Sequence, residues 1–96
     1  MRPSERLIAQ RDQVLALAAR HGARHVRVFG SAARQNDRDD SDVDLLVEWP
    51  AGRSLLQLVG LQLELEAELG VKVDLCTERE LHPLLRDRIL AEAKVL

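Results

Sequence analysis

Residues 41–49 read SDVDLLVEW and place two carboxylates at the start of an apolar run. Asp42 and Asp44 are two residues apart, so in an extended strand both side chains project from one face. A second apolar run, VKVDLC at residues 71–76, contains Asp74. A carboxylate within an apolar strand is costly unless it is paired or bound to a cation. The pattern therefore predicts a site where three acids meet around cations.

A small-residue turn precedes the acid pair. The run HVRVFGS ends at Gly30 and Ser31, and ten residues separate Ser31 from Asp42. Glycine lets a backbone approach a ligand closely, and the N–H groups that open a short helix can bind phosphate oxygens. A Gly-Ser pair alone is better explained by helix capping. Together with the acid pair and the later strand acid, it predicts metal-dependent nucleotide chemistry.

Periodicity and turn residues predict alternating helices and strands in a single domain over residues 1–96. Helices are expected at residues 4–21, with Ser4 as the cap, 31–34, 54–69 and 83–93; strands are expected at 24–29, 42–49 and 71–76. Residues 54–69 alternate like a strand, but their Leu, Glu, Gln and Ala content favours a helix. The predicted fold class is α/β (α+β), a small mixed β-sheet with helices packed on one face.

Strand parity brings the acids together. Val71, Val73 and Leu75 alternate with Lys72, Asp74 and Cys76, so the apolar row can face the helices while Asp74 faces away. The same division of residues 42–49 puts Asp42 and Asp44 on the face opposite the apolar row. Residues two apart on a strand are roughly 6.6 Å apart, and neighbouring strands about 4.8 Å. Leu46 shares the acid face and is expected to pack under a loop or a partner.

The donor set indicates the metal. Oxygen ligands without a nearby His or Cys favour Mg²⁺, with Mn²⁺ as the alternative, over zinc. Three acids without cations would repel one another, and the pKa of at least one would rise. Two divalent ions about 3.5–4 Å apart support phosphoryl and nucleotidyl transfer.

Composition excludes several classes of function. Phe29 and Trp49 are the only aromatic residues, so a stacking platform for nucleic acid is not expected. Cys76 is the only cysteine, which excludes an internal disulfide, and it is expected to pack as a small hydrophobe. With neither a membrane-length apolar run nor a secretory signal at the N-terminus, the expected location is cytoplasmic. The Arg-rich first 38 residues are interpreted as a solvated or a docking surface.

These residues resemble the minimal nucleotidyltransferases of the DNA polymerase β-like superfamily. The matching pattern is Phe29-Gly30-Ser31, then Asp42-Val43-Asp44, then Asp74, and it covers nearly the whole chain. The resemblance implies that Gly30 and Ser31 hold the β- and γ-phosphates of a nucleoside triphosphate, ATP. It implies that all three aspartates bind metal and that Asp74 also helps to deprotonate the acceptor. Arg34 also matches, either as a phosphate contact or in a structural salt bridge.

The resemblance further implies a partner. Larger relatives carry a helical domain that holds the acceptor, which residues 1–96 lack, so a partner is expected to supply it. Similar stand-alone members are antitoxins that transfer AMP to a HEPN-domain toxin. Two alternatives stay open: a module that neutralises the toxin by binding alone, and a nucleotidyltransferase of small molecules such as antibiotics. The oligomeric state stays open as well.

Overall fold

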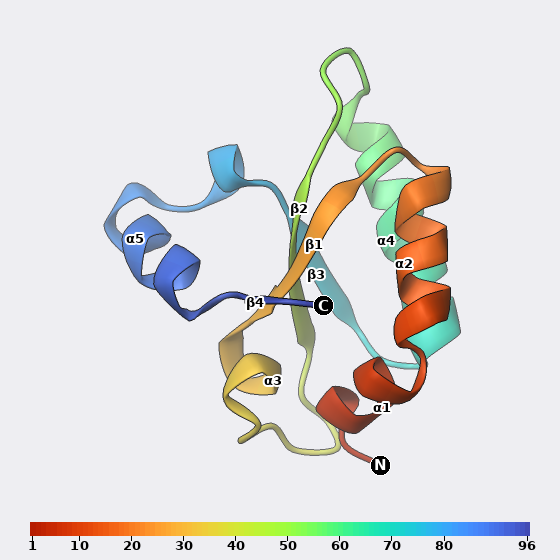
Figure 1. Ribbon diagram of the computed structural model, residues 1–96, viewed down its shortest axis with the longest axis vertical. Helices are drawn as coiled ribbons and strands as arrows, with labels where there is room; N and C mark the ends of the chain where they lie inside the picture. Colours follow the sequence, from red (N-terminus) through yellow and green to blue (C-terminus); the bar gives the residue numbers. More distant parts are fainter.

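A four-stranded mixed sheet with the order β3–β2–β1–β4 organises the chain (Figure 1). The computed structural model describes residues 1–96. The strands are β1 (Arg24–Phe29), β2 (Val43–Glu48), β3 (Val73–Cys76) and β4 (Lys94–Val95). β1 is antiparallel to both β2 and β4, whereas β2 and β3 are parallel. The first three strands were predicted to within two residues at each end, and β4 was not predicted.

The helices are α1 (Pro3–Ala9), α2 (Arg11–Arg20), α3 (Gly30–Arg34), α4 (Leu55–Leu69) and α5 (Pro83–Glu92), with a short 3₁₀ turn, η1 (Glu78–Glu80). The ambiguous segment 54–69 is a helix, as its composition predicted. The Ser54 hydroxyl caps it by accepting the Gln57 N–H at 3.2 Å. Gly70 ends it with a φ of 67°, a left-handed conformation that glycine adopts without steric cost.

The prediction of one helix over residues 4–21 was wrong. The helix breaks at Gln10, which ends α1 and opens α2 with φ −110° and ψ 21°. The Gln10 amide donates to the Glu68 carbonyl at 2.9 Å, and Arg6 donates to the Leu69 carbonyl at 3.3 Å. These bonds satisfy backbone carbonyls at the end of α4, which lack partners within their own helix. The break therefore depends on a contact between two helices, which the helical periodicity of residues 4–21 cannot reveal. Ser4 is not the cap either, because Arg2 precedes the first helical residue.

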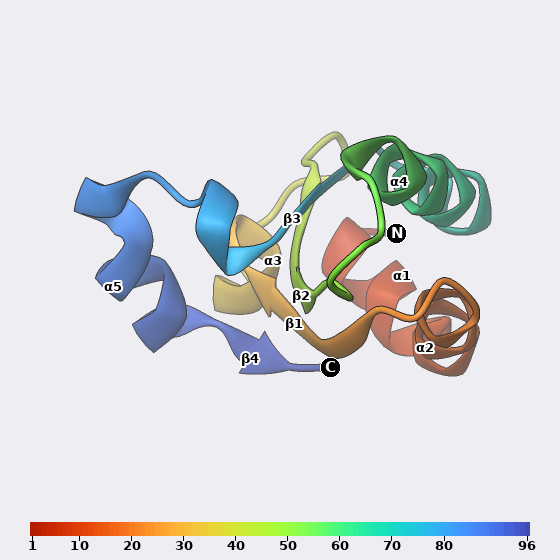
Figure 2. The same ribbon diagram turned by 90° about the horizontal axis from the view of Figure 1, so that it is seen from above.

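The helices cover the sheet unequally (Figures 1 and 2). α2 and α4 lie together on one face, where the apolar rows of the strands pack against them. α5 lies on the opposite side and buries no residue. The main core is made of aliphatic side chains, among them Val14, Val43, Leu45, Leu61, Leu65 and Val73. None of the helices combines the length and the apolar character that a membrane span requires.

Candidate active site

Asp44 and Asp74 lie side by side on the parallel strands β2 and β3. They are register partners, flanked by the pairs Val43–Val73 and Leu45–Leu75. Those four neighbours are buried, as strand parity predicted, so the two aspartates project from the other face of the sheet. Asp44 is partly buried, and Asp74 is exposed. Asp42 is exposed and immediately precedes β2.

Leu46 is the apolar residue on the acid face, and it is fully buried. It lies in one row with Arg27 on β1 and Cys76 on β3. Arg27 is also buried and donates to the Glu78 carboxylate of η1 at 3.1 Å. Since β2 contacts η1, this segment of the chain helps to cover the acid face beside Leu46. Leu46 therefore needs no partner protein to bury it.

The electrostatics of Asp44 fit a cation site. Burial raises the pKa of the Asp44 carboxyl, and repulsion from Asp74 and Asp42 raises it further, to about 6. A bound cation would relieve that repulsion, and the available ligands are oxygen atoms, which suit Mg²⁺ and Mn²⁺. The residues present thus fit a divalent ion by donor type and by charge.

The three aspartates do not form a closed set of metal ligands in this structure. No group of three His, Cys, Asp or Glu side chains is arranged to hold one metal ion. The backbone places Asp44 and Asp74 in register, and Asp42 is two residues from Asp44. Ligation of one ion by all three would therefore require their side chains to change conformation.

Gly30, in the small-residue turn, lies directly against Asp44. It opens α3 with a φ of 73°, a region that side chains with a Cβ rarely adopt. A Cβ at this position would overlap the Asp44 carboxylate oxygen Oδ2. Position 30 therefore needs glycine both for its backbone conformation and for the space that Asp44 occupies. Ser31 follows in α3, partly buried.

Arg34 forms an ion pair with Glu92 at the end of α5. Its Nη1 lies 3.0 Å from both carboxylate oxygens of Glu92. Glu92 also accepts the Gly30 N–H at 2.7 Å. Of the two sequence interpretations of Arg34, the salt bridge is the one that this structure contains. Glu92 was not singled out from the sequence, because no local motif relates it to a glycine 62 positions earlier.

Cys76 lies near the acids but is unsuited to act as a thiolate. Burial raises the pKa of its thiol to about 12, with further contributions from Asp74, Glu80 and Asp44. The thiol therefore stays protonated at neutral pH and does not compete as a nucleophile or a soft metal ligand. This agrees with its expected role as a packed side chain.

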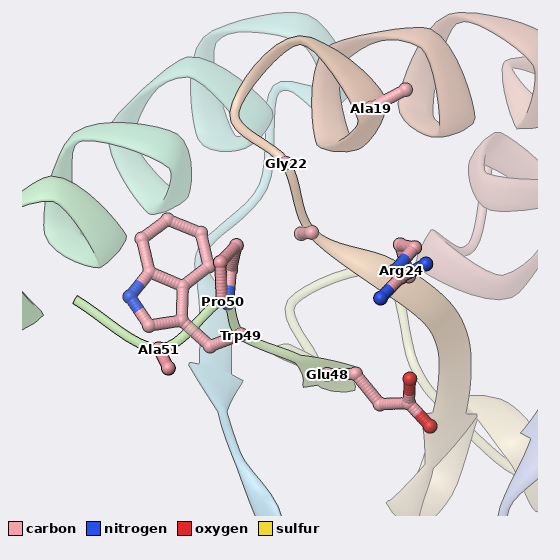
Figure 3. Close-up of a pocket in the computed structure, with 8 residues that line it drawn as sticks. Ala19, Gly22, Arg24, Glu48, Trp49, Pro50 and Ala51 are labelled. Carbon is pink, nitrogen blue, oxygen red and sulfur yellow. The ribbon is translucent and has the colours of Figure 1, made fainter. Parts of the chain in front are cut away.

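A separate hollow lies at the other end of β2 (Figure 3). Its lining comes from the end of α2, the start of β1 and the segment after β2, and consists of Ala19, Gly22, Ala23, Arg24, Glu48, Trp49, Pro50 and Ala51. None of the predicted site residues lines it. The candidate active site is therefore the surface around Gly30, Asp44 and Asp74.

Comparison with known proteins identifies the family of this fold. The family model described as "Nucleotidyltransferase domain" matches residues 11–96. The chain belongs to this family. Among the nucleotidyltransferases that it resembles is MJ0435 of Methanocaldococcus jannaschii, provisionally named a protein adenylyltransferase. The two are 47% identical over 81 residues, covering 84% of this chain and 87% of that protein.

Solved structures show the same minimal nucleotidyltransferase fold. One, described provisionally as a minimal nucleotidyltransferase, is 55% identical with a TM-score of 0.86 and covers 97% of this chain and 95% of its own. A second, a toxin–antitoxin crystal structure with AMP-PNP, has a TM-score of 0.76. It is 20% identical, covers 88% of this chain and 69% of its own, and shows likeness of fold alone.

Proposed function

We propose that this nucleotidyltransferase is a magnesium-dependent protein adenylyltransferase that transfers AMP from ATP to a HEPN-domain toxin, as the antitoxin of the pair. The single observation that carries the proposal is the in-register pair Asp44–Asp74 beside Gly30. It combines a cluster of mutually repelling carboxylates with a glycine turn whose backbone N–H donates to an anionic partner, here the Glu92 carboxylate. We propose a cytoplasmic location, where both ATP and a toxin would be available to the protein.

The nucleotide would lie along the α3 turn. Gly30 offers a backbone N–H, and Ser31 a hydroxyl, to the β- and γ-phosphates. Arg34 lies one turn further along α3 and can neutralise phosphate charge. These three residues bind and orient the triphosphate so that its α-phosphorus points towards the acid pair. Such positioning contributes much of the rate in phosphoryl transfer.

The acids would perform the chemistry. Asp42, Asp44 and Asp74 would hold two Mg²⁺ ions, which supply charge stabilisation for the entering and leaving oxygens when bound. Asp74 is exposed on β3, so it is accessible to an incoming hydroxyl and can accept its proton. The acceptor oxygen then bonds to the α-phosphorus, the bond to the bridging oxygen breaks, and pyrophosphate leaves. One AMP group is transferred for each ATP.

A protein acceptor is supported by the likeness to MJ0435, and a toxin as that protein by the fold shared with a toxin–antitoxin structure. The HEPN class of the toxin rests on the family resemblance of the sequence. The active-site edge itself is open on this chain, since Asp42 and Asp74 are both exposed. A protein hydroxyl can therefore approach without a domain having to open. Nothing in this geometry requires nucleic acid as the acceptor.

Label transfer tests the proposal directly. The chain is incubated with ATP labelled at the α-phosphate, Mg²⁺ and a HEPN-domain toxin, and label on the toxin is measured. We expect transfer by the wild type, loss of more than about 100-fold in Asp44→Asn, and no loss in Asp12→Asn. Asp12 is a matched control because its carboxylate is exposed on α2, far from the acid face in sequence and fold. Absence of transfer by the wild type would refute the proposal.

A binding-only antitoxin is the second candidate, and exposed leucines favour it. Leu56 and Leu63 on α4 and Leu84 on α5 are 79%, 58% and 86% exposed, which is unusual for side chains without a partner. If binding alone neutralises the toxin, Asp44→Asn should still rescue toxin-expressing cells. If transfer is required, that variant should fail to rescue although it is folded.

A further inference from the structure

The Glu92 carboxylate occupies the place where the proposed function puts a phosphate. Its Oε1 accepts the Gly30 N–H at 2.7 Å, and both of its oxygens lie 3.0 Å from Arg34 Nη1. A carboxylate and a phosphate present the same chemistry here, since each is an anion whose oxygens accept from N–H donors. Two of the three groups proposed to bind the triphosphate therefore already bind an anion from the chain itself.

The C-terminal segment brings Glu92 to this place. Glu92 is the last residue of α5 and directly precedes the segment that forms β4. β4 pairs with β1 through Val28–Lys94, and Lys94 Nζ donates to the Ala33 carbonyl of α3 at 2.8 Å. The backbone next to residue 92 is thus anchored to β1 and to α3, the elements that meet at Gly30. Only the side chain has to rotate for Glu92 to leave the turn.

Glu92 is ionised at neutral pH. The hydrogen bond from Gly30 and the contact with Arg34 hold the pKa of its carboxyl below the usual value, although burial opposes that shift. Its negative charge also contributes to raising the pKa of Asp44. Glu92 therefore adds a further negative charge to a cluster of acids. Repulsion between Glu92 and the aspartates is unfavourable, and the hydrogen bonds from Gly30 and Arg34 to Glu92 offset it.

We propose that Glu92 is an internal substitute for phosphate, which the triphosphate of the nucleotide must displace from Gly30 and Arg34. The inference rests on the proposed function, because it assumes that the α3 turn binds a nucleoside triphosphate. The displaced side chain releases both donors together, so nucleotide binding and the break of the Glu92–Arg34 pair are one event. Glu92 then sets the apparent affinity for nucleotide without touching the reacting atoms.

The size of the effect follows from the fraction of molecules in which the turn is free. The apparent Kd equals the intrinsic Kd divided by that fraction, so occupancy of the turn by Glu92 in nine molecules of ten would weaken binding about tenfold. Glu92→Gln keeps the length of the side chain and one carbonyl acceptor but removes the charge. It should weaken the contact with Arg34 and tighten nucleotide binding by about three- to tenfold.

Calorimetric titration in Mg²⁺ with AMP-CPP, an ATP analogue whose α,β-methylene bridge prevents transfer of AMP, tests this inference. We compare the wild type, Glu92→Gln and Glu64→Gln. Glu64 is the matched control, since it is a glutamate in a surface ion pair, with His21, on the α4 side of the sheet. Tighter binding by Glu92→Gln alone supports the proposal. Unchanged or weaker binding overturns it and would make Glu92 a brace for the turn.

The test separates the two proposals. Tighter binding by Glu92→Gln without any label transfer to the partner would support the inference and refute the adenylyltransferase function. If the wild type and Glu92→Gln bind the analogue equally well and label is transferred, the adenylyltransferase function is supported and the inference about Glu92 is refuted. No binding by either protein at millimolar analogue would overturn both. If Glu92→Gln does not fold, Glu92→Asp, whose shorter side chain cannot reach both donors, must bind more tightly than the wild type or the inference fails.

Discussion

Asp44 of β2 and Asp74 of β3 are register partners across a parallel strand pair, with buried valine and leucine pairs on both sides. Their backbones are held by the sheet, so they cannot separate when their carboxylates repel. The repulsion is instead expressed in the raised pKa of Asp44. An enzyme that binds cations can use such a pair, because the unfavourable interaction is removed when the site is loaded.

Removing one charge from the pair should stabilise the metal-free protein. We expect Asp44→Asn to raise the free energy of unfolding by about 1–2 kcal/mol at pH 8, after allowance for solvent screening of a half-buried group. Chemical denaturation without divalent ions measures it. The same variant should abolish label transfer. A destabilised Asp44→Asn protein would show that the carboxylate makes a structural bond instead.

The stability of the metal-free protein should depend on pH near Asp44. Because the pKa of Asp44 is raised in the folded state, to about 6, the folded protein binds this proton more tightly than the unfolded chain does. Its contribution to stability is therefore largest below about pH 4 and is lost as the pH rises through about 6. Asp44→Asn should lack this component in denaturation curves from pH 4 to 8. Identical pH profiles for the two proteins would contradict the assignment.

Magnesium should stabilise the folded protein, and more so at pH 8 than at pH 5. A cation that binds only the folded state raises stability by mass action, and protonated carboxylates bind it poorly. We expect the thermal midpoint to rise by a few degrees with 10 mM Mg²⁺ at pH 8, on the order of 1 kcal/mol. Asp74→Asn should reduce the rise, whereas Asp12→Asn should not. An equal rise in all three proteins would indicate a general salt effect.

Gly30→Ala tests the space beside Asp44. The added Cβ would overlap the Asp44 carboxylate, and the alanine would have to adopt the positive φ of Gly30. Gly52→Ala is the matched control, since Gly52 also has a positive φ, 88°, but has open space around it. We expect a loss of about 1 kcal/mol for Gly52→Ala and at least about 2 kcal/mol for Gly30→Ala, with loss of nucleotide binding in the latter alone. Equal losses in stability would refute the steric argument.

Asp37 shows a buried carboxylate with a structural role. Its side chain is fully buried in the loop before β2, and Oδ2 accepts the Ser4 N–H of α1 at 2.8 Å. Burial by itself would raise the pKa of Asp37, but the hydrogen bonds from Ser4 and from the Asp37 backbone, together with the charge of Arg2, outweigh burial and lower that pKa. Asp37→Ala should cost about 1–3 kcal/mol of stability, and Asp39→Ala, an exposed neighbour, close to none. Denaturation of both variants measures the difference.

Most of the fold could be predicted because its signals are local. Strand β1 and helix α4 follow from periodicity, propensity and the glycines that end them. The two-residue spacing of Asp42 and Asp44 placed both on the face opposite Val43. Local patterns could not predict β4, whose two residues form a strand only because β1 is beside them. They also missed the break at Gln10, which depends on carbonyl groups of α4.

The amino-acid sequence by itself determined the alternation of elements, the face on which each aspartate lies and the need for glycine at a tight turn. These properties depend on backbone geometry over a few residues. Only the tertiary structure decided that Asp74 pairs with Asp44 and that Glu92 lies on Gly30. Such contacts join residues 30 and 62 positions apart, and their energy comes from packing and charge in the folded chain.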